Sequence, residues 1–181
     1  TSYTITVKHK GTLVRGLQNY SLIISGAGGT AYCPSAATST AGTKIDSIQL
    51  NNIKFSKTTA DNYVDNTALF VNGESNGTVS LFMKLSSADA TNNNRFVKVF
   101  IDYNNNGVFD ANELVHTSPA ITNGDYSANF DLISNLIINQ FTKLRVVVAE
   151  TSVATNVTAC GTYTSGETQD YTLRVVNPSN D

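Results

Sequence analysis

The chain of 181 residues contains no Trp, one Met, two Cys, two His and three Pro, and only 14% of its residues are charged. Two histidines leave little material for general acid–base catalysis. The 12 Lys and Arg are balanced by 14 Asp and Glu and are scattered along the chain. A nucleic-acid partner held through its phosphates is therefore not expected. No run of 18 apolar residues occurs, so we expect no membrane insertion.

Thr, Asn and Ser, with 23, 21 and 17 residues, make up a third of the chain. Thr favours strands, whereas Asn, Ser and the 12 Gly favour turns. Short blocks of alternating apolar and polar residues recur, separated by turn signals at 72–73, 76–77 and 123–124. They predict strands at 3–7, 20–24, 47–55, 68–71, 78–85, 96–101, 126–132, 144–149 and 171–176, with a loop at 132–138. The fold class expected is all-β, an antiparallel, jelly-roll-like β-sandwich with little or no helix.

A glycine-rich segment near the start divides the chain. Residues 1–26 are expected to form a β-hairpin, which is either two added strands of the sandwich or the tail of a preceding domain. Residues 27–32 would form a joint, 33–177 the sandwich, and 178–181 a C-terminal linker. Because an isolated hairpin is marginally stable in water, residues 1–26 should pair with another surface. Self-association through this hairpin is one such pairing.

Cys33 and Cys160 are the only cysteines. Their spacing is not CxxC and no histidines cluster with them, which argues against a zinc site and against thioredoxin-type chemistry. Two explanations remain, a disulfide, which we favour, and two separate buried thiols. A disulfide would close a long loop, stabilise the fold by about 4–5 kcal/mol, and require an oxidising compartment. The first residues lack the signature of a signal peptide, so any such segment is expected to have been removed. The sequence thus predicts a secreted or cell-surface protein.

Residues 102–113 read DYNNNGVFDANE and match the calcium-loop pattern D-x-[DN]-x-[DN]-G-x5-E at every defined position. Gly107 would allow the tight turn, and three carboxylates would supply the charge for a divalent cation. The flanking residues read as strands, so Ca²⁺ here would fix a loop and would not open a helix pair as in a sensor. The alternative is an Asn-rich turn without an ion. The predicted ligands are Asp102, Asn104, Asn106, the carbonyl of Val108, Asp110 and Glu113.

The segment 160–173, CGTYTSGETQDYTL, resembles the signature of the GEVED domain. The resemblance extends back through 101–104 with Gly107, Phe109 and Glu113, and then through 63–67, 48–53 and 33–34. It covers about residues 33–176. Two positions differ from the family pattern, since Thr168-Gln169 replaces Val-Glu and Tyr103 stands where a Trp is often found.

This resemblance implies an accessory β-sandwich module of a large secreted bacterial protein of the Bacteroidetes type, such as a peptidase or an adhesin. The first hairpin also resembles the end of the jelly-roll domain that follows subtilisin-like peptidase domains. The resemblance therefore implies a secreted serine peptidase as the parent protein.

Glu167 and Asp170 lie beside the last expected strand. They could serve as additional calcium ligands, support the ligands from behind, or anchor a neighbouring loop by accepting backbone N–H bonds. The alternative is a solvated turn. Tyr171 is expected in the core, with its hydroxyl bonded to the backbone.

No catalytic arrangement stands out, because no G-x-S-x-G motif is present and both cysteines would be bonded. We therefore expect no enzymatic activity in this chain. The function favoured is a calcium-stabilised accessory or structural module that acts in stability, spacing or adhesion. Its partners would be other domains of the same exported protein and a surface glycan or protein. The alternatives are a self-assembling extracellular subunit and a carbohydrate-binding module, which would use the loop tyrosines Tyr32, Tyr63, Tyr103 and Tyr163.

Overall fold

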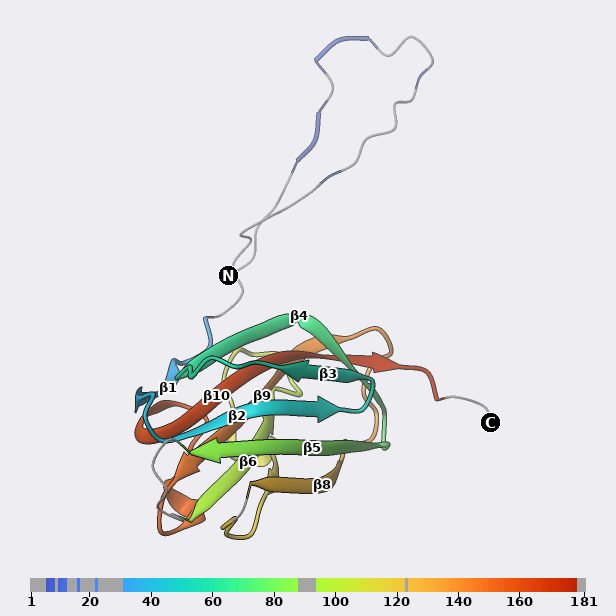
Figure 1. Cartoon of the computed structure of the whole chain (residues 1–181). Coiled ribbons are helices and arrows are strands. Elements are labelled where there is room, and N and C mark those ends of the chain that lie inside the picture. The colour runs from blue at the N-terminus through green and yellow to red at the C-terminus, as the bar shows by residue number, and fades with distance from the viewer. Residues whose placement is uncertain are drawn as a thin grey trace.

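The computed structural model describes residues 6–8, 10–12, 16, 22, 31–87, 94–122 and 124–178. In these residues two β-sheets pack face to face (Figure 1), which confirms the predicted all-β sandwich. The helical elements of this part are two short 3-10 helices, η1 (Ala111–Glu113) and η2 (Ala154–Asn156). Within the described residues, no helix has the length and apolar character needed to span a bilayer.

The larger sheet is built around the 16-residue strand β10 (Gly161–Val176). On one side, β9 (Phe141–Glu150), β6 (Arg95–Ile101) and β7 (Leu114–Thr117) follow in antiparallel order. On the other side, β1 (Ser35–Ser39) and β4 (Tyr63–Glu74) pair with successive parts of β10. Both of these pairings are parallel, unlike the purely antiparallel arrangement predicted. Parallel pairing requires a long connection, and most of the sandwich lies between these strands and β10 in the sequence.

The smaller sheet has the order β3 (Ile53–Ser56), β2 (Thr43–Leu50), β5 (Thr78–Ser87) and β8 (Asp125–Asp131), and all its pairs are antiparallel. The single strand predicted at 47–55 is wrong, because Asn51 turns the chain there with φ of 44°. Its side-chain oxygen accepts a hydrogen bond from the backbone N–H of Ser80 at 2.8 Å. This side chain thereby holds the β2–β3 turn against β5.

The turn predicted at 72–73 is also wrong, because both residues lie inside β4. Gly73 serves close packing at this position, since a Cβ would lie 2.5 Å from Cδ1 of Leu132. The turn at 76–77 and the loop at 132–138 are confirmed. Most of the hairpin predicted at 1–26 and of the joint at 27–32 lies outside the described residues, as do position 123 and residues 179–181 of the linker.

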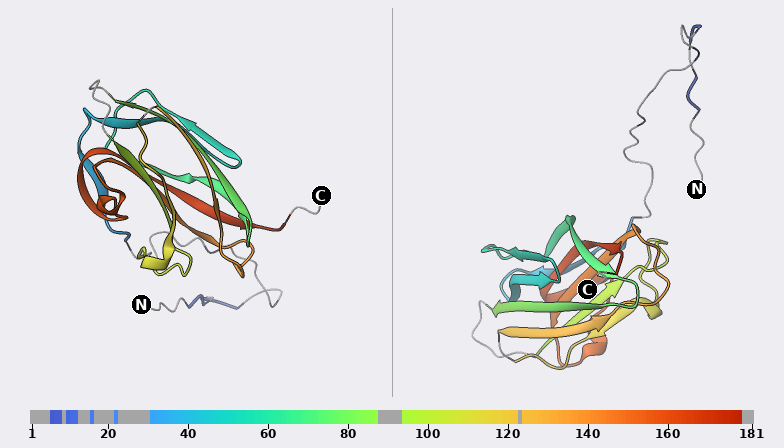
Figure 2. Two further views of the ribbon diagram at one scale, coloured as in Figure 1. Left: turned by 90° about the horizontal axis from the view of Figure 1, so that it is seen from below. Right: turned by 90° about the vertical axis from the view of Figure 1, so that its right-hand side faces the viewer.

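Apolar side chains fill the space between the sheets, which appear as separate layers in Figure 2. In β9, Leu144, Val146 and Val148 face this main core. Val147 and Ala149 point the other way, into a second cluster that contains Val157 and Ala159 from the segment before β10. Burial on both faces explains the uninterrupted apolar run of β9 at residues 146–149.

Cys33 and Cys160 form a disulfide, with their Cα atoms 5.5 Å apart. The bond joins the segment before β1 to the segment before β10, across 127 residues of sequence. The predicted disulfide is therefore confirmed, and the alternative of two separate thiols is wrong.

Candidate metal centre

The loop 102–113 connects β6 to β7, and η1 forms its last turn. Its first residue is fixed by β9, because the backbone N–H of Asp102 donates to the carbonyl of Lys143 at 3.1 Å. The Thr142 hydroxyl donates in turn to the carbonyl of Asp102. Asn105 and Gly107 adopt φ of 55° and 83°, so the chain makes the tight turn expected of Gly107.

The two carboxylates at the ends of the loop lie inside it. Asp102 is 0% exposed and Glu113 is 1% exposed. The Asp102 carboxylate accepts the N–H groups of Asn106 at 3.1 Å and Gly107 at 2.8 Å. The Glu113 carboxylate accepts the N–H groups of Asn104 at 3.3 Å and Asp110 at 2.9 Å. The backbone of the loop is therefore wrapped around these two acids.

The other predicted side-chain ligands are linked to one another on the same loop. The amide groups of Asn104 and Asn106 donate to one oxygen of Asp110, at 3.1 and 3.2 Å. Their own side-chain oxygens accept backbone N–H groups, from Asn106 at 2.9 Å and from Val108 at 2.8 Å. A network of hydrogen bonds, in part from backbone N–H groups, thus links all five predicted side-chain ligands, and Val108 joins it through its N–H.

Among the described residues, no basic side chain pairs with the acids of this loop. The ion pairs of the described residues involve none of Asp102, Asp110 and Glu113. Burying carboxylates without a counter-charge is costly. Carboxylate and amide oxygens are the donors that Ca²⁺ prefers, so the residues present fit this ion. In the described part of the chain, no three His, Cys, Asp or Glu are grouped to hold a metal, and Asn oxygens would have to supply the remaining ligands.

Tyr32 is a member of this site that the sequence did not indicate. The sequence offered it only as a loop tyrosine for the alternative of a carbohydrate-binding module. In the structure its hydroxyl donates to Oδ2 of Asp102 at 2.6 Å. Burial and, next, the hydrogen bond and charge of Asp102 raise the pKa of Tyr32, so the hydroxyl keeps its proton. Of the other tyrosines, Tyr63 is on β4 with its hydroxyl bonded to Asp170 at 3.0 Å, and Tyr103 and Tyr163 are partly buried.

Glu167 and Asp170 belong to a stretch of β10 in which four consecutive polar residues, 167–170, are buried. Glu167 forms an ion pair with Lys57 at 2.9 Å and accepts the N–H of Ile45 at 3.0 Å. It therefore anchors β2, a strand of the smaller sheet. Asp170 forms two bonds with Arg145, to Nε at 2.7 Å and to Nη2 at 2.8 Å. The solvated turn weighed as the alternative is therefore wrong. Neither acid has a hydrogen bond or ion pair to the six predicted ligands within the described residues.

The side chains of Glu167, Gln169 and Tyr171 form a hydrogen-bonded row. The Gln169 amide donates to Glu167 at 2.6 Å, and the Tyr171 hydroxyl donates to the Gln169 oxygen. The amide of Asn66 donates to the same hydroxyl at 3.1 Å. Tyr171 is buried as predicted, but its hydroxyl is bonded to side chains and not to the backbone. Burial raises the pKa of Glu167, against the opposing effect of its bonds to Gln169, Ile45 and Lys57.

Gly166 begins this stretch with φ of 140°, and a Cβ at this position would lie 2.0 Å from the carbonyl oxygen of Val148. We expect Gly166→Ala to destabilise the fold by at least about 2 kcal/mol, because backbone strain of about 1–3 kcal/mol is added to a clash with β9. Gly161→Ala is the matched control, since φ there is 98° but no atom lies within 4 Å of an added Cβ. Urea unfolding measures both losses. Equal losses would contradict close approach to β9 as the main cause.

Comparison with known families identifies the second half of the sandwich. Residues 96–174 match the family model of the GEVED domain. The match runs from β6 to β10 and therefore includes both the 102–113 loop and the buried polar stretch of β10. No curated protein matches the chain. The match confirms the resemblance to the GEVED domain for residues 96–174, which are 79 of the 181 residues.

Proposed function

We propose that the chain is a non-catalytic, calcium-stabilised accessory module of a secreted or cell-surface bacterial protein. The observation that carries the proposal is the burial of Asp102 and Glu113 in one loop without an ion pair among the described residues. Bound Ca²⁺ would supply the missing positive charge. The ion would be held by Asp102, Asn104, Asn106, the Val108 carbonyl, Asp110 and Glu113.

The chain's own residues prepare this site. β9 fixes the backbone of Asp102 from behind through Lys143 and Thr142. The N–H groups of the loop orient the carboxylates of Asp102 and Glu113 toward its interior. A loop closed by an ion opens less often, so it resists proteases outside the cell. The disulfide supports the same setting, because it requires an oxidising compartment.

The interior charges support a structural role over a catalytic one. Arg145 and Lys57 are bonded to the buried acids Asp170 and Glu167, so these four groups hold the strands together. The partners proposed are other domains of the same exported protein, with a secreted serine peptidase as the parent protein suggested by the resemblance. Self-assembly through residues 1–26 stays a prediction, because most of that segment lies outside the described residues.

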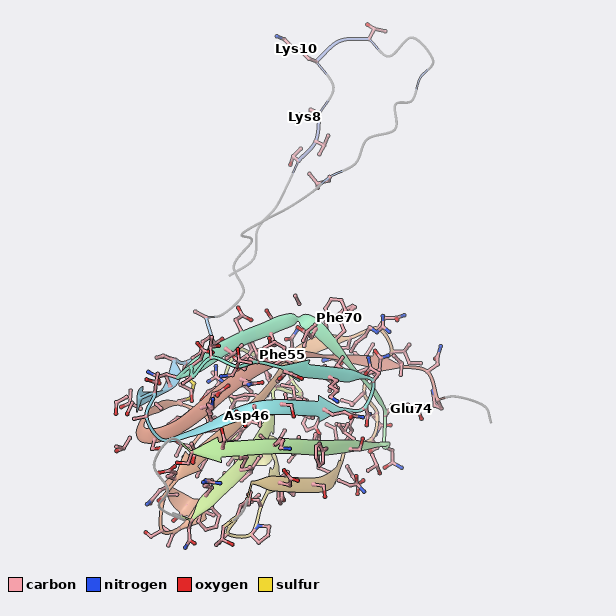
Figure 3. All side chains as sticks on the ribbon, in the orientation of Figure 1. Lys8, Lys10, Asp46, Phe55, Phe70 and Glu74 are labelled. Atoms are coloured by element: carbon pink, nitrogen blue, oxygen red, sulfur yellow. A yellow bond between two sulfur atoms is a disulfide. The ribbon has the colours of Figure 1, made fainter. Side chains whose placement is uncertain are left out.

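One observation favours glycan binding as a second function. Phe70 and Phe141 are 45% and 49% exposed, and their ring centroids lie 5.6 Å apart on β4 and β9. Phe70 lies at the surface of β4 in Figure 3. Exposed aromatic rings are the usual contacts for sugars. If they bind a glycan, Phe70→Ala and Phe141→Ala should abolish saturable binding and leave the response to calcium unchanged.

Thermal unfolding in excess EDTA and in millimolar Ca²⁺ tests the calcium site. We expect Ca²⁺ at about 100 times its Kd to add about 2.7 kcal/mol and to raise the Tm by about 5–10 °C. Asp102→Ala and Glu113→Ala should each abolish this rise. Asp125→Ala, which removes an exposed carboxylate from β8, is the matched control and should keep it. An unchanged Tm in the native protein would contradict the metal assignment.

A further inference from the structure

Tyr32 directly precedes Cys33 and reaches the 102–113 loop. Its hydroxyl donates to Asp102, and its ring centroid lies 5.3 Å from that of Phe109. The ammonium group of Lys143 lies 4.9 Å from the centre of the Tyr32 ring. The segment that carries one half of the disulfide is therefore bonded directly to a predicted calcium ligand.

Arg145 forms a second connection between the disulfide and the loop. Its Nη1 donates to the carbonyl of Cys33 at 2.9 Å and to the carbonyl of Ala159 at 2.7 Å. Its guanidinium carbon lies 5.0 Å from the centre of the Phe109 ring. Phe109 therefore contacts both Tyr32 and the cation that holds the two cysteine segments.

The segment 31–34 lies outside the strands, since β1 begins at Ser35. Several contacts hold this segment in place: the disulfide, the hydrogen bonds that involve Tyr32 and Arg145, and a bond from the N–H of Gly161 to the carbonyl of Pro34 at 2.8 Å. A cavity of about 520 Å³ lies beside it, lined by residues 31–36 together with Tyr63, Lys143, Arg145 and Asp170. The segment therefore has room to move when one of these anchors is lost.

We propose that Tyr32 couples the calcium loop to the Cys33–Cys160 disulfide, so that Ca²⁺ protects the disulfide from reduction and the disulfide raises the affinity for Ca²⁺. This inference rests on the proposed calcium site. An ordered Asp102 holds Tyr32 and keeps the Cys33 segment closed, and an intact disulfide holds Tyr32 where it can orient Asp102. Coupling between two sites is reciprocal at equilibrium, so a disulfide that raises the affinity for Ca²⁺ is itself stabilised by bound Ca²⁺.

The reaction that reports the coupling is reduction by a dithiol such as dithiothreitol. A reagent thiolate attacks one sulfur and breaks the bond between Cys33 and Cys160, and the second reagent thiol then closes the reagent into a cyclic disulfide. Two electrons and two protons pass to the protein, which keeps both cysteines as thiols. Attack depends on access to the sulfur, so the rate reports how firmly the segment is held.

The experiment compares the rate of reduction in EDTA and in saturating Ca²⁺ for the native protein, Tyr32→Phe and Tyr63→Phe. Tyr63→Phe is the matched control, because it also removes one hydroxyl bonded to an aspartate, but at Asp170. Alkylation and mass spectrometry follow the free thiols. We expect Ca²⁺ to slow reduction at least about fivefold in the native protein and in Tyr63→Phe. In Tyr32→Phe the protection should fall below about twofold, although calorimetry still detects Ca²⁺ binding.

Two different results separate the coupling from the calcium site itself. Full protection in Tyr32→Phe would overturn the coupling, because general stabilisation by Ca²⁺ protects every variant alike. Absence of binding heat in the native protein would overturn the calcium site. A weaker affinity for Ca²⁺ in Cys33→Ser/Cys160→Ser than in the oxidised native protein would support the reciprocal effect. If this double variant fails to fold, the rates measured on the oxidised proteins still decide the question.

Discussion

Arg145→Met is expected to destabilise the fold by about 3–5 kcal/mol, because it removes the buried cation of Asp170 and leaves only the more exposed Lys143 near that carboxylate. Arg145 and Asp170 are 2% and 1% exposed and are joined by two short bonds. The substitution also leaves the carbonyls of Cys33 and Ala159 without their shared donor. Urea unfolding at pH 7 measures the loss.

Lys143→Met is the matched control for this prediction. Lys143 also lies near Asp170, at 3.5 Å, but its side chain is more exposed and forms no second bond to that carboxylate. We expect a loss of less than about 1 kcal/mol, as for a partly solvated pair. If both variants lost the same free energy, the two-bond geometry of Arg145 would not be the source of the stability.

The second large effect is expected from Cys33→Ser/Cys160→Ser. The bond spans 127 residues, and removing such a constraint from the unfolded chain should lower the free energy of unfolding by about 4–5 kcal/mol. The native protein in excess reductant should unfold at the same urea concentration as this variant. A loss below about 1 kcal/mol would mean that the non-covalent links, such as those from Arg145 and from Gly161 to Pro34, hold the two segments together without the disulfide.

Alternation of apolar and polar residues predicted most strands, because it directly reflects burial on one face. It missed β1, whose sequence SAATS has no large apolar residue and which forms against the start of β10. It also found only the last part of β10, since residues 161–170 are mainly polar. These polar residues are tolerated inside the fold because distant residues satisfy them, such as Lys57 for Glu167.

The candidate site was predictable only where its residues are close in sequence. The spacing within 102–113 identified five residues that one hydrogen-bond network links in the structure. Tyr32 is 70 residues away from Asp102, and no local pattern indicates that its hydroxyl reaches this acid. Likewise, the buried partner of Asp170 could not be chosen from the 12 basic residues before the register of β9 and β10 was known.

The position of β10 has a consequence for how the chain folds. β1, β4 and β9 all precede β10 in the sequence, and all three hydrogen-bond to it. None of them can complete its pairing while the chain is being synthesised, until residues 161–176 have emerged. Such non-local pairing makes folding slow, and until β10 is present β1, β4 and β9 expose unpaired edges. The larger sheet can therefore be assembled only after its last strand, β10, has arrived.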